Sequence, residues 1–165
     1  GDMGEVVVWN TTSCAPVWAQ YQSCGVTGLA VSEDGGVVAA LGDHGIVTTW
    51  RIGSGEVGHV LSELSTLGLH FATTVHAFPH GERLATVFTA EAIIWNLTSG
   101  RALQVLSSWP KVTESIVVSP SGDQLIVCGG GDITIWDTAR GMVLHQWSCP
   151  LEGPAPRGDR RCLVD

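Results

Sequence analysis

The stretches VVVWN (6–10), IVTTWR (46–51), AIIWN (92–96) and ITIWD (133–137) decide the fold of this 165-residue chain. Each stretch is a short aliphatic run that closes on a tryptophan. Trp9, Trp50, Trp95 and Trp136 recur at spacings of 41, 45 and 41 residues. A period of this length indicates repeated four-stranded sheets, because one such sheet cannot bury both faces alone and must stack on copies of itself. We therefore expect an all-β fold, a fragment of a β-propeller built from four-stranded antiparallel blades.

Each full repeat shows the same order of segments. The second repeat has an apolar first strand at 28–32, a tight turn (SEDGG) that starts at Ser32, a second strand at 37–41, and then the tryptophan strand. Ser, Asp, Pro and Gly favour such turns through their φ preferences and local hydrogen bonds. A more polar fourth strand closes the repeat. The apolar first strands predict burial near the propeller axis, and the mixed fourth strands predict a partly exposed rim.

The repeats divide the chain into half a blade and three full blades. We expect the third and fourth strands of a blade at 1–22, full blades at 23–65, 66–108 and 109–149, and a disordered tail at 150–165 that is rich in Pro, Gly and charge. A propeller closes with about four to eight blades. About three and a half blades therefore predict part of a larger propeller, whose open edges the rest of the parent chain or another chain completes.

Composition limits the partners and the compartment. The formal net charge of −8 disfavours nucleic acid, because an acidic surface repels phosphate. The five cysteines form no CxxC pair, which indicates reduced thiols and a cytoplasmic protein. The sequence has no apolar run of 18 residues, so we expect no membrane span.

Two sets of residues carry a resemblance to a known family. The pairs Trp136–Asp137, Trp9–Asn10 and Trp95–Asn96 end their strands alike, and the turns SPSG at Ser119 and SEDG at Ser32 share one pattern. With its period, the chain resembles the WD40-repeat family over roughly residues 3–148. The resemblance implies a propeller that serves as a non-catalytic platform for protein partners.

The repeats depart from the family pattern at the positions of its locking network. The family's His before the first strand falls on Gln22, Gly68 and Trp109, and its Asp before the tryptophan falls on Met3, His44, Thr89 and Gly130. We therefore expect degenerate blades that depend on their neighbours for stability. Such degenerate repeats are similar to the WD40 arrays attached to NACHT-type ATPases.

One end of the predicted blades carries the candidate partner-binding residues. Asp43, Glu91 and Asp132 fall in equivalent turns of successive blades, and His44 adjoins the first of them. Trp109 lies in a polar loop before a first strand, which the resemblance places on the same face. Repeated carboxylates suit a basic partner, and an exposed tryptophan is a typical hot-spot residue. The alternatives are turn chemistry for the acids and a capping contact on the next blade for Trp109.

The sequence predicts no enzyme, cofactor or metal site. It has no GxSxG, Walker or HExxH motif, and its histidines fall on separate strands and loops. The best enzymatic alternative is a quinoprotein-like propeller, because DTARGMVLHQW (137–147) is similar to the docking repeat of that family. Only this repeat carries the closing Trp147, whereas all four carry the strand-end tryptophan. A third alternative is a truncated product without independent function.

Overall fold

The computed structural model describes residues 4–43, 45–62, 72–89, 91–107, 113 and 115–148. These residues form fourteen strands and no helix. The first sheet contains β1 (Gly4–Asn10) and β2 (Ala15–Gln22). The second contains β3 (Val26–Val31), β4 (Val37–Gly42), β5 (Val47–Arg51) and β6 (Val57–Leu61). The third contains β7 (Ala72–Ala77), β8 (Arg83–Phe88), β9 (Glu91–Asn96) and β10 (Arg101–Ser107). The fourth contains β11 (Ser115–Val118), β12 (Gln124–Gly129), β13 (Asp132–Asp137) and β14 (Met142–Ser148).

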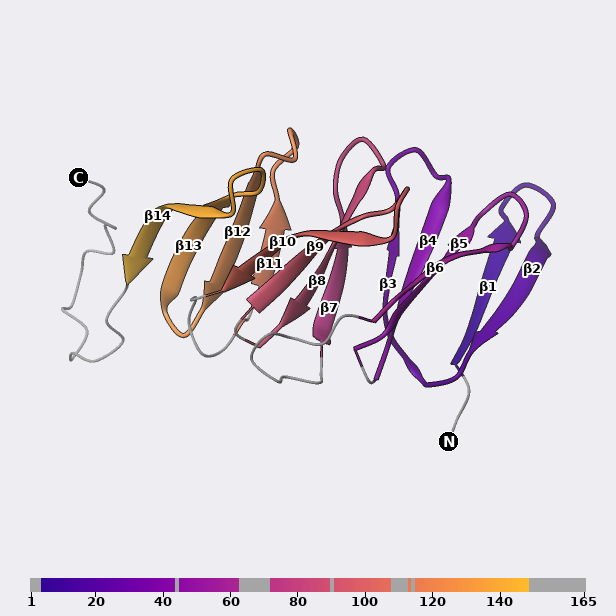
Figure 1. The fold of residues 1–165 in the computed structure, drawn as a ribbon. Coiled ribbons are helices and arrows are strands. Elements are labelled where there is room, and N and C mark those ends of the chain that lie inside the picture. The colour runs from indigo at the N-terminus through magenta and orange to yellow at the C-terminus, as the bar shows by residue number, and fades with distance from the viewer. Residues whose placement is uncertain are drawn as a thin grey trace, which may run out of the picture.

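Every sheet is an antiparallel meander in which sequence neighbours pair in chain order. The four sheets stand side by side, with β1–β2 at one end of the row and β11–β14 at the other (Figure 1). The row does not close on itself. The all-β fold of blade-like sheets predicted from the tryptophan period is confirmed. In the described ranges, no helix is long and apolar enough to cross a lipid bilayer.

The turns between first and second strands follow from serine and glycine. The backbone amide of Ser32 donates to the Val37 carbonyl at 2.9 Å, and the Ser32 hydroxyl accepts from the Val37 amide at 2.8 Å. Gly35 allows the turn because its φ is +67°, a value that side chains with a Cβ rarely adopt. Ser119 makes the same two contacts with Gln124, at 2.9 and 3.0 Å. Each turn thus fixes the register of the two strands that it joins.

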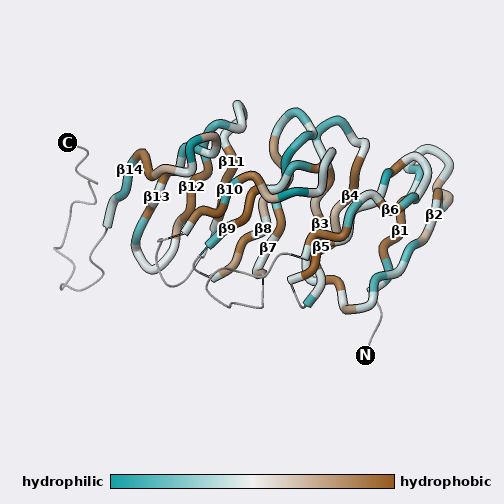
Figure 2. The backbone as a smooth tube through the Cα atoms, viewed as in Figure 1, coloured by the Kyte–Doolittle hydropathy of each residue, from teal (hydrophilic) through white to brown (hydrophobic). Residues whose placement is uncertain are grey.

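The core consists of layers between adjacent sheets. Alternate side chains of one strand point to opposite neighbours. In β9, Ile93 and Trp95 pack toward the second sheet, whereas Ala92 and Ile94 pack toward the fourth. Brown apolar tube therefore runs through the middle strands, and teal marks many of the turns (Figure 2). A third layer joins the first and second sheets around Trp50.

Burial along a sheet differs from the expected gradient. The deepest strands are the second and third ones of the middle sheets: β8 is buried at every residue except Arg83, and β9 at every residue except Asn96. The first strands β3 and β11 alternate between partly buried or buried and exposed positions. A first strand has a hydrogen-bonded neighbour on one side only, and in the described residues its outer positions face no further layer. The middle strands are covered by sheets on both faces.

Candidate functional site

A repeated hydrogen bond joins the last strand of each of the first three sheets to the sheet that follows it. Trp18 Nε1 donates to the Ile52 carbonyl at 2.7 Å, His59 Nε2 to the Thr98 carbonyl at 3.1 Å, and Gln104 Nε2 to the Ala139 carbonyl at 3.1 Å. Each donor stands nine residues after the tryptophan of its own repeat. Each acceptor stands two or three residues after the tryptophan of the next repeat. We call these contacts the inter-sheet bonds.

A glycine makes room for each inter-sheet donor. Gly55, Gly100 and Gly141 stand five residues after a tryptophan and have φ values of +71°, +67° and +66°. A Cβ on these glycines would meet the side chain of the donor at 2.9, 2.6 and 2.7 Å, respectively. Glycine is therefore needed here both for the left-handed backbone and for the close approach of the neighbouring sheet. This spacing of tryptophan, glycine and donor is visible in the sequence, but its meaning appears only when the sheets are stacked.

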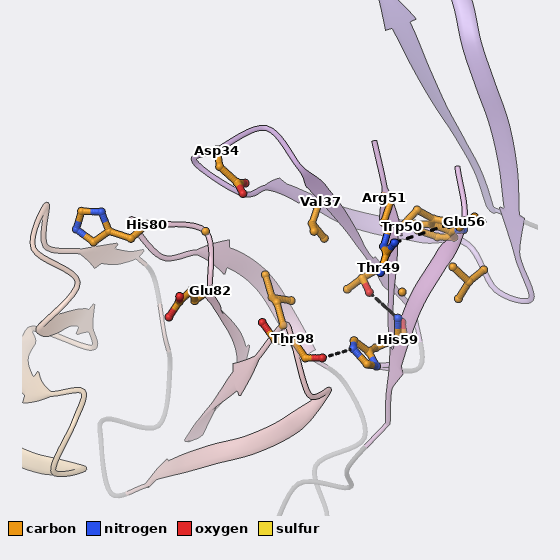
Figure 3. Close-up of a pocket in the computed structure, with 14 residues that line it drawn as sticks. Asp34, Val37, Thr49, Trp50, Arg51, Glu56, His59, His80, Glu82 and Thr98 are labelled. Atoms are coloured by element: carbon orange, nitrogen blue, oxygen red, sulfur yellow. Dashed lines mark hydrogen bonds and ion pairs between the residues drawn. The ribbon is translucent and has the colours of Figure 1, made fainter. Parts of the chain in front are cut away.

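The inter-sheet bond of His59 lies in a groove between the second and third sheets (Figure 3). The groove has a volume of about 830 Å³. Its walls come from the turn before β4, the ends of β5 and β6, the turn before β8, and the turn after β9. Three carboxylates line it, those of Asp34, Glu56 and Glu82. All three residues are exposed, so the groove presents negative charge to solvent.

Hydrogen bonds favour the ionised form of one of these acids. The Ser32 hydroxyl donates to Asp34 Oδ1 at 2.5 Å and the Gly36 amide donates to it at 3.0 Å. These donors, the hydroxyl first, hold the pKa of Asp34 below its usual range. The Asp34 carboxylate also lies against Gly81 of the next sheet, where a Cβ would meet it at 2.9 Å. Asp34 thus places a negative charge at the boundary between the second and third sheets.

The other charged groups of the groove leave Glu82 as its open carboxylate. Arg51 Nη1 lies 3.9 Å from Glu56 Oε2, and both side chains are largely exposed, so solvent weakens this pair. His80 lines the groove, but its imidazole points toward Glu33, which does not line it. His80 Nδ1 lies 3.8 Å from Glu33 Oε2. Glu82 is labelled at the wall opposite Arg51 in Figure 3. Asp34 and Glu82 thus present carboxylates to the groove from the second and the third sheet, respectively.

The acidic residues predicted for partner binding are placed unequally. Asp43 is exposed in the turn after β4. Glu91 and Asp132 open strands β9 and β13 rather than standing in turns, and Glu91 is 0 % exposed. A carboxylate buried in the sheet offers a partner no surface, so Glu91 is no contact residue in this conformation. Asp132 is partly exposed. His44 and Trp109 lie outside the described residues.

The repeat tryptophans divide into three buried residues and one exposed one. Trp50, Trp95 and Trp136 are 1 %, 3 % and 5 % exposed and pack toward the preceding sheet. Trp9 is 58 % exposed, because within the described part of the chain no sheet lies on the side of β1 that it faces. Asp137, next to the last tryptophan, accepts from the amides of Ala139 and Arg140 at 2.9 Å each. Its role is to shape the turn before β14.

No protein-family model matches the chain, and no curated protein matches it. Among the described residues, no group of three or more His, Cys, Asp or Glu side chains is arranged to hold a metal ion.

Proposed function

We propose that this chain is a non-catalytic protein-interaction scaffold of WD40-like blades. The groove between β3–β6 and β7–β10 receives a basic segment of a protein partner. The observation that carries this proposal is the set of three exposed carboxylates, Asp34, Glu56 and Glu82, around one groove between two sheets. Binding residues commonly lie on turns that a rigid framework positions, and complementary charge selects the partner.

Asp43 and Asp132 form a second candidate surface. They lie at the opposite ends of the strands from the groove, because the turns after second strands and those after third strands emerge on opposite edges of an antiparallel sheet. Each surface can therefore be altered while the other stays intact.

The two surfaces can be compared by matched pairs of substitutions. A library of displayed peptides would be selected on the immobilised chain, and the recovered peptides would be titrated against two variants. Glu56→Gln with Glu82→Gln removes two charges from the groove, and Asp43→Asn with Asp132→Asn removes two from the opposite edge. We expect peptides rich in Lys and Arg whose affinity falls about tenfold with the first variant and less than about twofold with the second.

Salt gives a second readout. Binding to exposed carboxylates weakens as ionic strength rises, because the Debye length shrinks to about 3 Å in 1 M salt. If the recovered peptides carried no excess of basic residues, or bound equally well to the groove variant, the groove would not be the binding surface. A loss confined to the Asp43 and Asp132 variant would move the site to the opposite edge.

A further inference from the structure

One face of β11–β14 points away from the other sheets. The equivalent face of the third sheet is wholly buried. In the third sheet, that face is formed by side chains that pack under the fourth sheet and are each 0 % exposed: Ala85, Val87, Ala92, Ile94 and Leu106. The strand register aligns them with Ile126, Cys128, Ile133, Ile135 and Trp147. Ile133 and Trp147 are each 42 % exposed. We call these five residues the trailing face.

The opposite end of the row exposes the complementary half of the same interface. Trp50, Trp95 and Trp136 each pack on the sheet before their own, and Trp9 stands at the same repeat position. Ile93, two residues before Trp95, and Ala102, seven residues after it, pack in the same layer as Trp95, and Val7 and Pro16 stand at those positions relative to Trp9. Trp9 is 58 % exposed, Pro16 is exposed and Val7 is partly exposed. We call them the leading face.

The inter-sheet bonds also run from each sheet to the sheet that follows it. Their donors, Trp18, His59 and Gln104, bond the turn of the following sheet. The fourth repeat has His145 nine residues after its tryptophan, opposite Ile135 in the register, where Gln104 lies opposite Ile94. His145 stacks on Trp147 with ring centroids 5.4 Å apart. The trailing face therefore ends in a donor and an apolar surface of the kind that the chain uses at its internal boundaries.

We propose that the trailing face of one copy binds the leading face of a second copy, head to tail. The chain builds this interface three times internally, and the first and last of the described sheets carry its two unmatched halves. The leading face has two strands, so it covers only part of the trailing face. Two copies closed in this way would form a ring of eight sheets, two of them two-stranded, within the range of about four to eight for propellers. If the rotation did not close, the same contact would give longer head-to-tail chains.

One residue makes this contact weaker than the internal ones. Cys14 stands five residues after Trp9, where Gly55, Gly100 and Gly141 stand in the other turns. Its φ is +52°, so it keeps the glycine conformation but carries a Cβ. That Cβ occupies the space that a donor from the preceding sheet fills elsewhere, which leaves His145 of a docked copy less room. Replacing Cys14 with glycine should therefore strengthen the association.

The test measures self-association of the full chain by sedimentation velocity at increasing concentration. The wild-type chain should form dimers or longer assemblies. Trp9→Asp damages the leading face and Ile133→Asp the trailing face, and each should weaken self-association on the order of 100-fold, because docking would bury an unpaired carboxylate. An equimolar mixture of the two variants should form a 1:1 complex, since one leading face and one trailing face stay intact. Cys14→Gly should tighten the association about twofold to tenfold.

Controls and contrary outcomes separate this contact from others. Leu103→Asp, at an exposed apolar position of β10 away from both end faces, should associate as the wild type does. Circular dichroism would verify that each variant is folded. A wild-type chain that is folded and monomeric at all concentrations would overturn the proposal. So would a single variant that keeps full self-association, because that result would indicate a contact between two like faces.

Discussion

Thr86 provides Trp95 with a hydrogen bond that the equivalent positions of the neighbouring sheets cannot provide. Trp95 Nε1 donates to Thr86 Oγ1 at 2.9 Å, and both residues are buried. In the second and fourth sheets the register places Ala40 and Val127 where the third sheet has Thr86, and neither carries a hydroxyl. The third sheet therefore has a polar anchor on its tryptophan strand in addition to apolar packing.

Thr86→Val should destabilise the chain by about 1–3 kcal/mol. The substitution keeps the shape of the side chain but leaves the buried indole N–H of Trp95 without this acceptor. Urea unfolding followed by tryptophan fluorescence would measure the loss. Thr27→Val is the matched control, because Thr27 is exposed on β3 and its hydroxyl donates to a strand carbonyl. Equal effects of the two substitutions would contradict the role given to Thr86.

His76 should make the stability of the chain fall below neutral pH. Partial burial of its imidazole on β7 lowers its pKa, because burial disfavours the charged form. The unfolded chain, with a histidine pKa near 6.5, then binds the proton more tightly than the folded chain. The contribution of His76 is thus fully present above about pH 6.5 and is lost as the pH falls from there to the folded pKa.

His76→Gln removes this titrating group, so the variant can be compared with the wild-type chain. The free energy of unfolding would be measured for both chains between neutral and mildly acidic pH. The wild type should lose more stability than the variant over this interval. Parallel curves would show that the proton uptake belongs to other groups.

At the scale of the element, the fourth strand and the turn that follows the next tryptophan act as a pair. Strands β2, β6 and β10 each place one donor side chain over a glycine of the next sheet and bond a carbonyl of the same turn. The hydrogen bond is exposed in the case of His59, so its net energy is small. Its main effect is geometric: it sets how closely one sheet approaches the next.

Gly100→Ala should destabilise the chain by about 1–3 kcal/mol. The new Cβ would lie 2.6 Å from His59 Nδ1, and the backbone φ there is +67°. Gly53→Ala, where a Cβ would meet nothing within 4 Å, is the control. Adding His59→Ala should recover the part of the loss that comes from the contact and leave the part that comes from the backbone. If the double variant recovered nothing, the contact with His59 would have no energetic role.

At the scale of the whole molecule, stability is a property of neighbouring sheets rather than of single ones. Leu125 is 0 % exposed and belongs to the layer between the third and fourth sheets. Among the sheets that the structure describes, the fourth packs on one neighbour, whereas the second and third each pack on two. A stack of this kind loses its terminal unit first, because that unit has one stabilising interface.

Leu125→Ala should destabilise the chain by about 2–5 kcal/mol, by leaving a cavity at this boundary. Amide hydrogen exchange should show lost protection in β11–β14 while β4 and β5 stay protected. Leu29→Ala is the control, because Leu29 is 58 % exposed on β3 and its removal leaves no buried cavity. Uniform loss of protection over all sheets would indicate that the stack unfolds as one unit.

The sequence by itself determined the repeat, the strands and the turns. The strand-end tryptophans at intervals of 41, 45 and 41 residues, with Ser and Gly in the turns, encode local hairpins whose hydrogen bonds form between chain neighbours. The spacing of Asp43, Glu91 and Asp132 places them at one edge of the sheets, but it gives no information on exposure, and Glu91 is buried. Whether a side chain contacts solvent depends on the strands and sheets that stack around it.

Only the tertiary structure decided which residues join the sheets. Trp9 and Trp95 share one sequence context, yet one is 58 % exposed and the other 3 %, because a preceding sheet covers only the second. Likewise, His59 and Gln104 became inter-sheet donors because a glycine turn of the next repeat lies beneath each. Local hydrogen bonding depends on neighbours in the chain and can be predicted from sequence. Packing between sheets depends on residues about 40 positions apart, and on which sheets are present to cover each face.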